Sequence, residues 1–364
     1  MMKANKPLNA VKFRIISGSS GFGIVTLLLI CVSIILALRI LYVSYCTSGL
    51  SQPVIIELPR GVSAVGTFEI LHSSSVVKSK KIFLGYLKIT RSSRSIKSGV
   101  YKFYPQEDVF RVAHRLIRGD TYRIKITVPE GWDSSQIAAL LKERGLGNPE
   151  RFLKYVKENK LEGYLFPETY YFDYGMREEY IAERMRQEFF RRVTPEMIER
   201  AANLGLNLSR WVTLASIIEK EATLRDRRLV SAVFHNRLKR NMYLESCATV
   251  LYALGFHKEK LSYADLKVKS PYNTYTHMGL PPGPIANPGM DSLLAAINPE
   301  DTDALFFVVS KSTDGIIQPQ HIFSRYYKDH INVQLKPKSP SENTRQPSGR
   351  DPSGKGATPI PAEH

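Results

Sequence analysis

An uninterrupted apolar run near the amino terminus constrains this chain more than any other feature. Residues 15–38 contain no charged side chain, and the stretch from Phe22 to Leu38 is almost wholly apolar. About 20 apolar residues in a helix span the hydrocarbon core of a bilayer, because a helix satisfies its backbone hydrogen bonds within itself. The sequence therefore predicts one transmembrane anchor over residues 21–45.

The charges on either side of this run predict its orientation. Four basic residues precede it: Lys3, Lys6, Lys12 and Arg14. Arg39 is the only charged residue close after it. Because basic residues favour the cytoplasmic side, we expect residues 1–20 to form a cytoplasmic tail and the remaining chain to lie outside the cytoplasm. A cleaved signal peptide is the alternative, although the run is long for one and no small-x-small cleavage site follows it.

Composition allows a folded protein and excludes several classes of function. Hydrophobic residues make up 43% of the 364 residues and charged residues 23%, which suits two or three compact units. The formal net charge of +17 suits nucleic acid, an anionic membrane surface or an acidic wall polymer. A folded part outside the cytoplasm would not meet DNA, so we predict no nucleic-acid partner. Three scattered cysteines predict neither a disulfide framework nor a metal site.

The part of the chain after the anchor contains a pattern that recurs 70 positions later. A short strand at 54–58 leads to Pro59 and Gly61, and an equivalent strand leads to Pro129 and Gly131. Both copies read strand, Pro-x-Gly turn, helix, helix. This layout is analogous to the LysM-type glycan-binding module. We therefore predict an α+β fold, with a LysM-like subdomain over 50–125 and a second α+β domain with a cleft over 126–335.

The carboxyl-terminal segment has a different composition. Residues 336–364 are rich in Pro, Ser and Gly and contain no aromatic residue. A segment with so little apolar surface cannot offset the entropy lost on folding. The sequence predicts a disordered tail.

The strongest helix candidate runs from Leu208 to Arg225, with Ser209 available as its N-cap. At ~100° per residue, Ile217 and Ile218 precede Glu221 by one turn and share its face. A carboxyl among large aliphatic side chains is poorly hydrated in its charged form and keeps its proton more readily. This property suits a general acid, and it selects Glu221 as the candidate.

Two features of the same segment qualify this hypothesis. Glu219 lies two residues from Glu221, so the two carboxylates point to opposite sides and cannot form a dyad. Arg225 follows Glu221 by four residues, and a plain surface ion pair between them is the alternative.

Several motifs follow one another along the chain in a specific order. They are residues 128–132 (VPEGW), 161–170 (LEGYLFPETY), 214–221 (LASIIEKE), 232–238 (AVFHNRL), 270–275 (SPYNTY) and 279–289 (GLPPGPIANPG). Together with the single anchor, this set resembles the endolytic murein transglycosylase family (YceG/MltG-like). The resemblance covers roughly residues 20–335 and is highly specific.

The resemblance implies a function and a catalytic residue. It places the family's catalytic glutamate at Glu221, in a catalytic domain over 126–335. It implies a lyase that cleaves the β-1,4 bond between N-acetylmuramic acid and N-acetylglucosamine of nascent glycan and leaves a 1,6-anhydro end. The substrate's own 6-hydroxyl is then the nucleophile, so no second carboxylate, metal or cofactor is required. Further implications are a bacterial inner-membrane location, a periplasmic catalytic domain, termination of strand elongation, and peptidoglycan synthases as partners.

The remaining motifs supply candidate substrate-binding residues. Their amide, hydroxyl, carboxyl and aromatic groups suit sugars: Asn236, Tyr272, Asn273, Thr274, Tyr275, Phe166 and Glu168. A structural turn with packing tyrosines is the alternative for 272–275. Residues 281–289 are too rich in Pro and Gly for a helix or strand and predict a stiff loop.

Two departures from the family pattern leave a rival hypothesis open. Cys247 and Ala248 stand where the family usually has Asp-Pro, and His330-Ile331-Asn332 interrupts the usual His-Asn pair. The rival is a glycan-binding scaffold whose catalytic domain is inert. The presence of Glu221 favours the enzyme.

Overall fold

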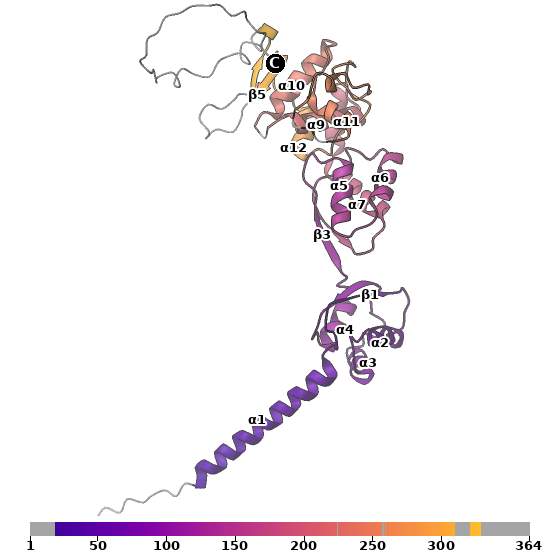
Figure 1. Ribbon diagram of the computed structural model, residues 1–364, viewed down its shortest axis with the longest axis vertical. Helices are drawn as coiled ribbons and strands as arrows, with labels where there is room; N and C mark the ends of the chain where they lie inside the picture. The colour runs from indigo at the N-terminus through magenta and orange to yellow at the C-terminus, as the bar shows by residue number, and fades with distance from the viewer. Residues whose placement is uncertain (1–18, 224, 257, 259, 310–320, 329–364) are drawn as a thin grey trace, which may run out of the picture. The chain divides into compact units, whose positions relative to one another are not determined.

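The computed structural model describes residues 19–223, 225–256, 258, 260–309 and 321–328 (Figure 1). Most of the predicted cytoplasmic tail, the predicted disordered tail and the interrupted pair at 330–332 lie outside the described residues. The chain divides into two compact units. The first runs through Ile126 and includes 141–147 and 170–177, and the second contains the rest from Thr127 onward.

The predicted anchor is a single helix, α1 (Ser19–Cys46). Its stretch from Val25 to Cys46 has a mean hydropathy of 2.6 and is not buried against other parts of the chain. Among the described helices it alone is long and apolar enough to cross a membrane. A helix with such exposed aliphatic side chains suits lipid as its surroundings, and an amino-terminal signal sequence has the same properties.

The first unit is built on an antiparallel pair, β1 (Val54–Leu58) and β2 (Gly99–Phe103). Three helices accompany it: α2 (Ala64–Ser73), α3 (Lys80–Ile89) and α4 (Val109–Arg118). Each begins at a residue whose side-chain oxygen accepts a backbone N–H of the first turn: Ser63, Ser79 and Asp108. Leu71, Phe83 and Phe103 are fully buried in its core.

The predicted internal repeat is confirmed as an order of elements. The second copy consists of β3 (Arg123–Thr127), α5 (Ser134–Glu143), α6 (Pro149–Glu158) and β4 (Thr169–Asp173), and β3 pairs with β4. Both copies therefore read strand, helix, helix, strand. Gly61 and Gly131 occupy equivalent turns with φ of 78° and 74°, a conformation that strains residues with a side chain. The turn geometry thus explains why both copies have a glycine at this position.

The second unit adds four helices in sequence, α7 (Glu178–Arg192), α8 (Pro195–Asn203), α9 (Leu208–Glu221) and α10 (Arg227–Lys239). They are followed by α11 (Cys247–Leu254), the short 3-10 helix η1 (Asp265–Lys267) and α12 (Met290–Ile297). An antiparallel pair, β5 (Phe306–Val309) and β6 (His321–Ser324), completes the described part. The mixture of helices and small sheets agrees with the predicted α+β class.

Helix α9 is the centre of this unit, and it differs from the prediction in three ways. It contacts α8, α10, α11 and α12, and Figure 1 shows the last three beside it. Every residue from Trp211 to Ile218 is buried, so the helix is a core helix and has no wet face over that length. Its N-cap is Asn207 rather than Ser209. It ends at Glu221 because Ala222 is extended, four residues before the predicted end at Arg225.

Candidate active site

The side chain of Glu221 lies at the carboxyl end of the core helix α9 and is half-buried. Its Oε1 atom accepts a hydrogen bond from the Ser246 hydroxyl at 2.5 Å and another from the Ala248 backbone N–H at 3.1 Å. Ala248 belongs to the first turn of α11, where backbone N–H groups have no partner within the helix and favour a negative charge. Within the described residues, Oε2 makes no hydrogen bond, so it is the oxygen available to a substrate.

The alternative surface ion pair is not formed. Arg225 lies beyond the end of α9, so the four-residue spacing no longer places it beside Glu221. No ion pair joins the two among the described residues. Glu219 is instead the partnered carboxylate, because Arg227 Nη2 lies 3.1 Å from its Oε1 and the Gly289 N–H donates to its Oε2 at 3.0 Å. The structure thus gives the two carboxylates separate surroundings.

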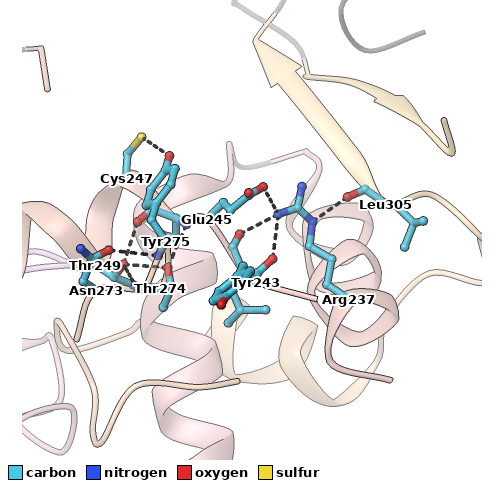
Figure 2. A network of polar contacts seen from close by, with 11 residues as sticks. Arg237, Tyr243, Glu245, Cys247, Thr249, Asn273, Thr274, Tyr275 and Leu305 are labelled. Carbon is cyan, nitrogen blue, oxygen red and sulfur yellow. Dashed lines mark hydrogen bonds and ion pairs between the residues drawn. The ribbon is translucent and has the colours of Figure 1, made fainter. Parts of the chain in front are cut away.

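Ser246 is held by hydrogen bonds to two buried threonines, Thr249 and Thr274, which Figure 2 labels. Its backbone N–H donates to Thr274 Oγ1 at 3.0 Å, and its carbonyl accepts from Thr249 Oγ1 at 2.7 Å. The two threonine hydroxyls lie 2.9 Å apart. Ser246, Thr249 and Thr274 are each at most 3% exposed. The hydroxyl that meets Glu221 is therefore held in one position.

Arg237 fixes the same segment from its other end. Its Nη1 atom lies 3.0 Å from Glu245 Oε2 and donates to the carbonyls of Tyr243 and Leu244, as Figure 2 shows in part. Its Nε donates to the Leu305 carbonyl at 2.7 Å. A buried guanidinium with this many partners orders the chain on both sides, so Arg237 positions residues 243–245 ahead of Ser246.

The predicted substrate segment 272–275 separates into buried and accessible residues. Asn273 and Thr274 are 0% and 1% exposed. Asn273 Nδ2 donates to the carbonyls of Leu266 and Val268, and its Oδ1 accepts from the Tyr275 N–H, so this side chain holds the loop together. Tyr272 and Tyr275 are half-buried and retain accessible surface.

Tyr275 lies beside the amino end of α11. Its hydroxyl oxygen is 3.1 Å from Cys247 Sγ (Figure 2). Burial raises the pKa of Tyr275 and also that of the Cys247 thiol, so both groups stay protonated and neutral at physiological pH.

The other three predicted contact residues support the walls of the second unit. Asn236 Nδ2 donates to the Thr302 and Ala304 carbonyls at 2.8 and 3.0 Å. Phe166 is 4% exposed in the core, and Glu168 forms an ion pair with Arg192. None of Asn236, Phe166 and Glu168 makes a hydrogen bond to Glu221 within the described part of the chain. Among those residues, no group of three or more His, Cys, Asp or Glu side chains could hold a metal ion.

Comparison with known proteins places this arrangement in a family. The sequence pattern of the YceG-like family matches residues 56–336. The chain belongs to the YceG-like family. A Bacillus subtilis (strain 168) protein named endolytic murein transglycosylase is 37% identical over 309 residues, which cover 77% of this chain and 84% of that protein. A Streptococcus pneumoniae serotype 2 protein of the same name is 30% identical and shares 78% of this chain, but only 59% of its own length.

A solved structure agrees with this membership. A 2.6 Å crystal structure of a yceG-like protein from Listeria monocytogenes matches with a TM-score of 0.51 and 32% identity, covering 79% of this chain and 100% of that chain. The family resemblance described above implies a proline at the position of Ala248. Proline has no backbone N–H, so the second hydrogen bond to Glu221 depends on this departure.

A second carboxylate, Glu162, belongs to the motif LEGYLFPETY and has a structural environment. The Ser134 hydroxyl donates to its Oε2 at 2.6 Å, and Asn287 Nδ2 donates to its Oε1 at 3.1 Å. Burial raises the pKa of Glu162 to about 7, against the hydrogen bonds from Ser134 and Asn287, which lower it. Asn287 is itself fully buried and bonds to Trp132 and Leu165. Glu162 is thus part of a polar junction between three segments.

This environment predicts a pH dependence of stability. The folded pKa of Glu162 lies above the unfolded value of 4.5, so its contribution is complete below about pH 4.5 and is lost as the pH rises through about 7. That shift corresponds to about 3 kcal/mol. We expect the melting temperature of the chain to fall between pH 5 and pH 8, and to fall less in Glu162→Gln, which cannot ionise. Thermal unfolding followed by circular dichroism measures both slopes, and equal slopes would contradict the assignment.

Proposed function

We propose that this chain is a membrane-anchored peptidoglycan lytic transglycosylase, in which Glu221 cleaves the β-1,4 bond between N-acetylmuramic acid and N-acetylglucosamine of nascent strands and thereby ends their elongation. The observation that carries the proposal is the carboxylate of Glu221, fixed through one oxygen by Ser246 and Ala248 and open through the other. Membership of the YceG-like family supports it, because relatives at 37% and 30% identity are named endolytic murein transglycosylases.

The proposed chemistry uses one carboxyl group twice. Protonated Glu221 gives its proton to the glycosidic oxygen as the bond from that oxygen to the muramoyl C1 breaks. The resulting carboxylate then takes the proton of the muramoyl 6-hydroxyl, whose oxygen bonds to C1 and closes a 1,6-anhydro ring. Glu221 ends protonated as it began, and no water is consumed. Because the substrate supplies the nucleophile, the mechanism needs no second carboxylate. The pairing of Glu219 with Arg227 therefore does not hinder it.

We assign the surrounding residues by their accessibility. Tyr272 and Tyr275 offer partly exposed rings on which sugar faces can stack, and a neutral Tyr275 hydroxyl can donate a hydrogen bond. Asn273 and Thr274 are buried and have an indirect role. Asn273 holds the loop together, and Thr274 positions Ser246. Asn236, Phe166 and Glu168 contribute by bracing the walls of the same unit.

The rest of the chain supplies location and partners in this proposal. Helix α1 anchors the chain in the bacterial inner membrane, with its amino terminus cytoplasmic and the second unit on the periplasmic side. The strand-helix-helix-strand unit around β1 and β2 holds glycan in the manner of a LysM module, and peptidoglycan synthases provide the nascent strands. Four basic residues before α1 support the orientation: Lys3, Lys6, Lys12 and Arg14.

Digestion of purified glycan strands by the full chain in detergent tests the reaction. We expect fragments that end in 1,6-anhydromuramic acid, lighter by one water than hydrolysis products of the same length, when masses are read by mass spectrometry. Reducing ends that carry an added water would make the chain a muramidase instead. Glycan that is bound and never cut would favour the scaffold hypothesis.

A further inference from the structure

A cavity of about 410 Å³ opens in the second unit beside the loop that carries Tyr275. Its lining includes five side chains that can donate hydrogen bonds: Lys267, Lys269, Ser270, Thr276 and His277. No carboxylate is among the lining residues. Val268 and Pro271 make part of the lining apolar, and the surrounding donors, two of them cationic, can receive an acceptor-rich, anionic group.

The two lysines of this cavity have no counter-ion in the described part of the chain. Lys267 and Lys269 are exposed and form no ion pair there. The neighbouring Lys258, by contrast, lies 2.5 Å from Asp265, whose carboxylate also accepts hydrogen bonds from Ser262. Asp265, the acidic residue nearest to these lysines in the sequence, is thus already paired with Lys258. Two lysines that line one cavity and form no ion pair among the described residues favour binding of a negative charge.

The loop that lines the cavity also contacts the segment that holds Glu221. Thr276 follows Tyr275 directly in the sequence. The Tyr275 hydroxyl oxygen lies 3.1 Å from Cys247 Sγ, and the adjacent Ala248 N–H donates to Glu221 Oε1. The side chain of Asn273 bonds to the carbonyls of Leu266 and Val268, next to both lysines. In the same loop, Thr274 Oγ1 accepts the backbone N–H of Ser246, and the Ser246 hydroxyl donates to Glu221. The cavity is therefore held in a fixed relation to the catalytic carboxylate.

We propose that this cavity binds a carboxylate of the stem peptide carried by a muramoyl residue next to the bond that is cut. The inference rests on the proposed function. The sugar backbone of a peptide-bearing strand is uncharged, so its negative charges are the carboxylates of the peptides. Lys267 and Lys269 pair with such a carboxylate, and the Ser270 hydroxyl, which accepts from the Tyr272 N–H and keeps its own proton available, donates to one of its oxygens. The chain thereby prefers strands with free peptide carboxylates over strands whose carboxylates are amidated.

Equilibrium binding of uncleaved strands tests this preference. The full chain with Glu221→Gln, in detergent, is titrated with peptide-bearing strands of one length, either with free carboxylates or after conversion of the carboxylates to amides. We expect Lys267→Ala/Lys269→Ala to weaken binding of the carboxylate strands by about tenfold, because two partly exposed charge contacts are lost. Binding of the amidated strands should not change. The difference should shrink as salt is raised.

A matched double variant controls for loss of overall charge. Lys157 and Lys239 are exposed helical residues of the same unit without an ion pair among the described residues. Lys157→Ala/Lys239→Ala should leave binding of both strands unchanged. Equal affinity of the Glu221→Gln chain for the two strands, or equal weakening by the control, would overturn the proposal. The binding experiment needs no turnover. A failed cleavage assay would therefore contradict the proposed function, whereas the binding experiment would still test the carboxylate preference.

Discussion

Glutamine at position 221 is expected to lower the rate of strand cleavage by about 1,000-fold, because it removes the only group that we assign to proton transfer. The amide oxygen of Glu221→Gln can still accept the hydrogen bonds from Ser246 and Ala248, so the local structure should persist. The amide can neither donate a proton to the leaving oxygen nor take one from the 6-hydroxyl. Release of anhydromuramoyl ends, quantified by mass spectrometry at saturating strand concentration, measures the effect.

Glu219 provides a control, because its substitution should lower stability and leave the cleavage chemistry intact. Glu219 is 6% exposed and pairs with Arg227, and breaking a buried pair by removing one charge costs about 3–5 kcal/mol. Glu219→Gln should therefore lower the melting temperature while the folded fraction still cleaves strands. If Glu219→Gln abolished cleavage in a folded chain and Glu221→Gln did not, the assignment of the acid/base would be reversed.

The candidate acid/base could be predicted from sequence, but the reason offered for it was incomplete. Periodicity placed Glu221 one turn after Ile217 and Ile218, and both are fully buried. Periodicity did not reveal that α9 is buried on every side, because that depends on four other helices packing around it. The distinguishing feature of Glu221 is its place at the last turn, where the core helix reaches accessible surface.

The groups that hold Glu221 could not be found by local pattern alone. Ser246 and Ala248 lie 25 and 27 residues away in the sequence, and their bonds to Glu221 depend on how α9 and α11 pack. A partial signal existed, since Ser246 precedes an apolar stretch that ends at Gly255, as expected for a short helix. The first backbone N–H groups of such a helix have no acceptor within the helix. Glu221 accepts one of them, the N–H of Ala248.

Residue type was a poor guide to which side chains can touch a sugar. Amides and hydroxyls suit sugar binding and loop bracing equally well, and only burial separates the two uses. Asn273 and Thr274 are buried and bonded within the chain, whereas the adjacent Tyr272 and Tyr275 keep accessible surface. Side-chain burial arises from long-range packing, so the sequence pattern could not assign it.

Removing the Ser246 hydroxyl should lower kcat by about 10- to 100-fold with little change in KM. A hydrogen bond to a charged group contributes about 1.5–3 kcal/mol, and its loss frees the carboxylate to rotate away from the productive position. The Ser246 side chain makes no capping bond to α11, so Ser246→Ala does not weaken that helix through lost capping. Steady-state kinetics on strands of one length separate kcat from KM, and Ser246→Thr, which keeps a hydroxyl, should restore most of the rate.

The backbone donor offers an independent test of the same positioning role. Ala248→Pro removes the N–H that lies 3.1 Å from Glu221 Oε1, and proline is tolerated in the first turn of a helix because its missing N–H has no helical partner there. We expect a further fall in kcat of similar size when Ala248→Pro is combined with Ser246→Ala. Each loss acts on the same oxygen, so Glu221 of the double variant has no fixed orientation left. Full activity in a double variant that melts like the wild type would show that cleavage does not depend on this fixed carboxylate.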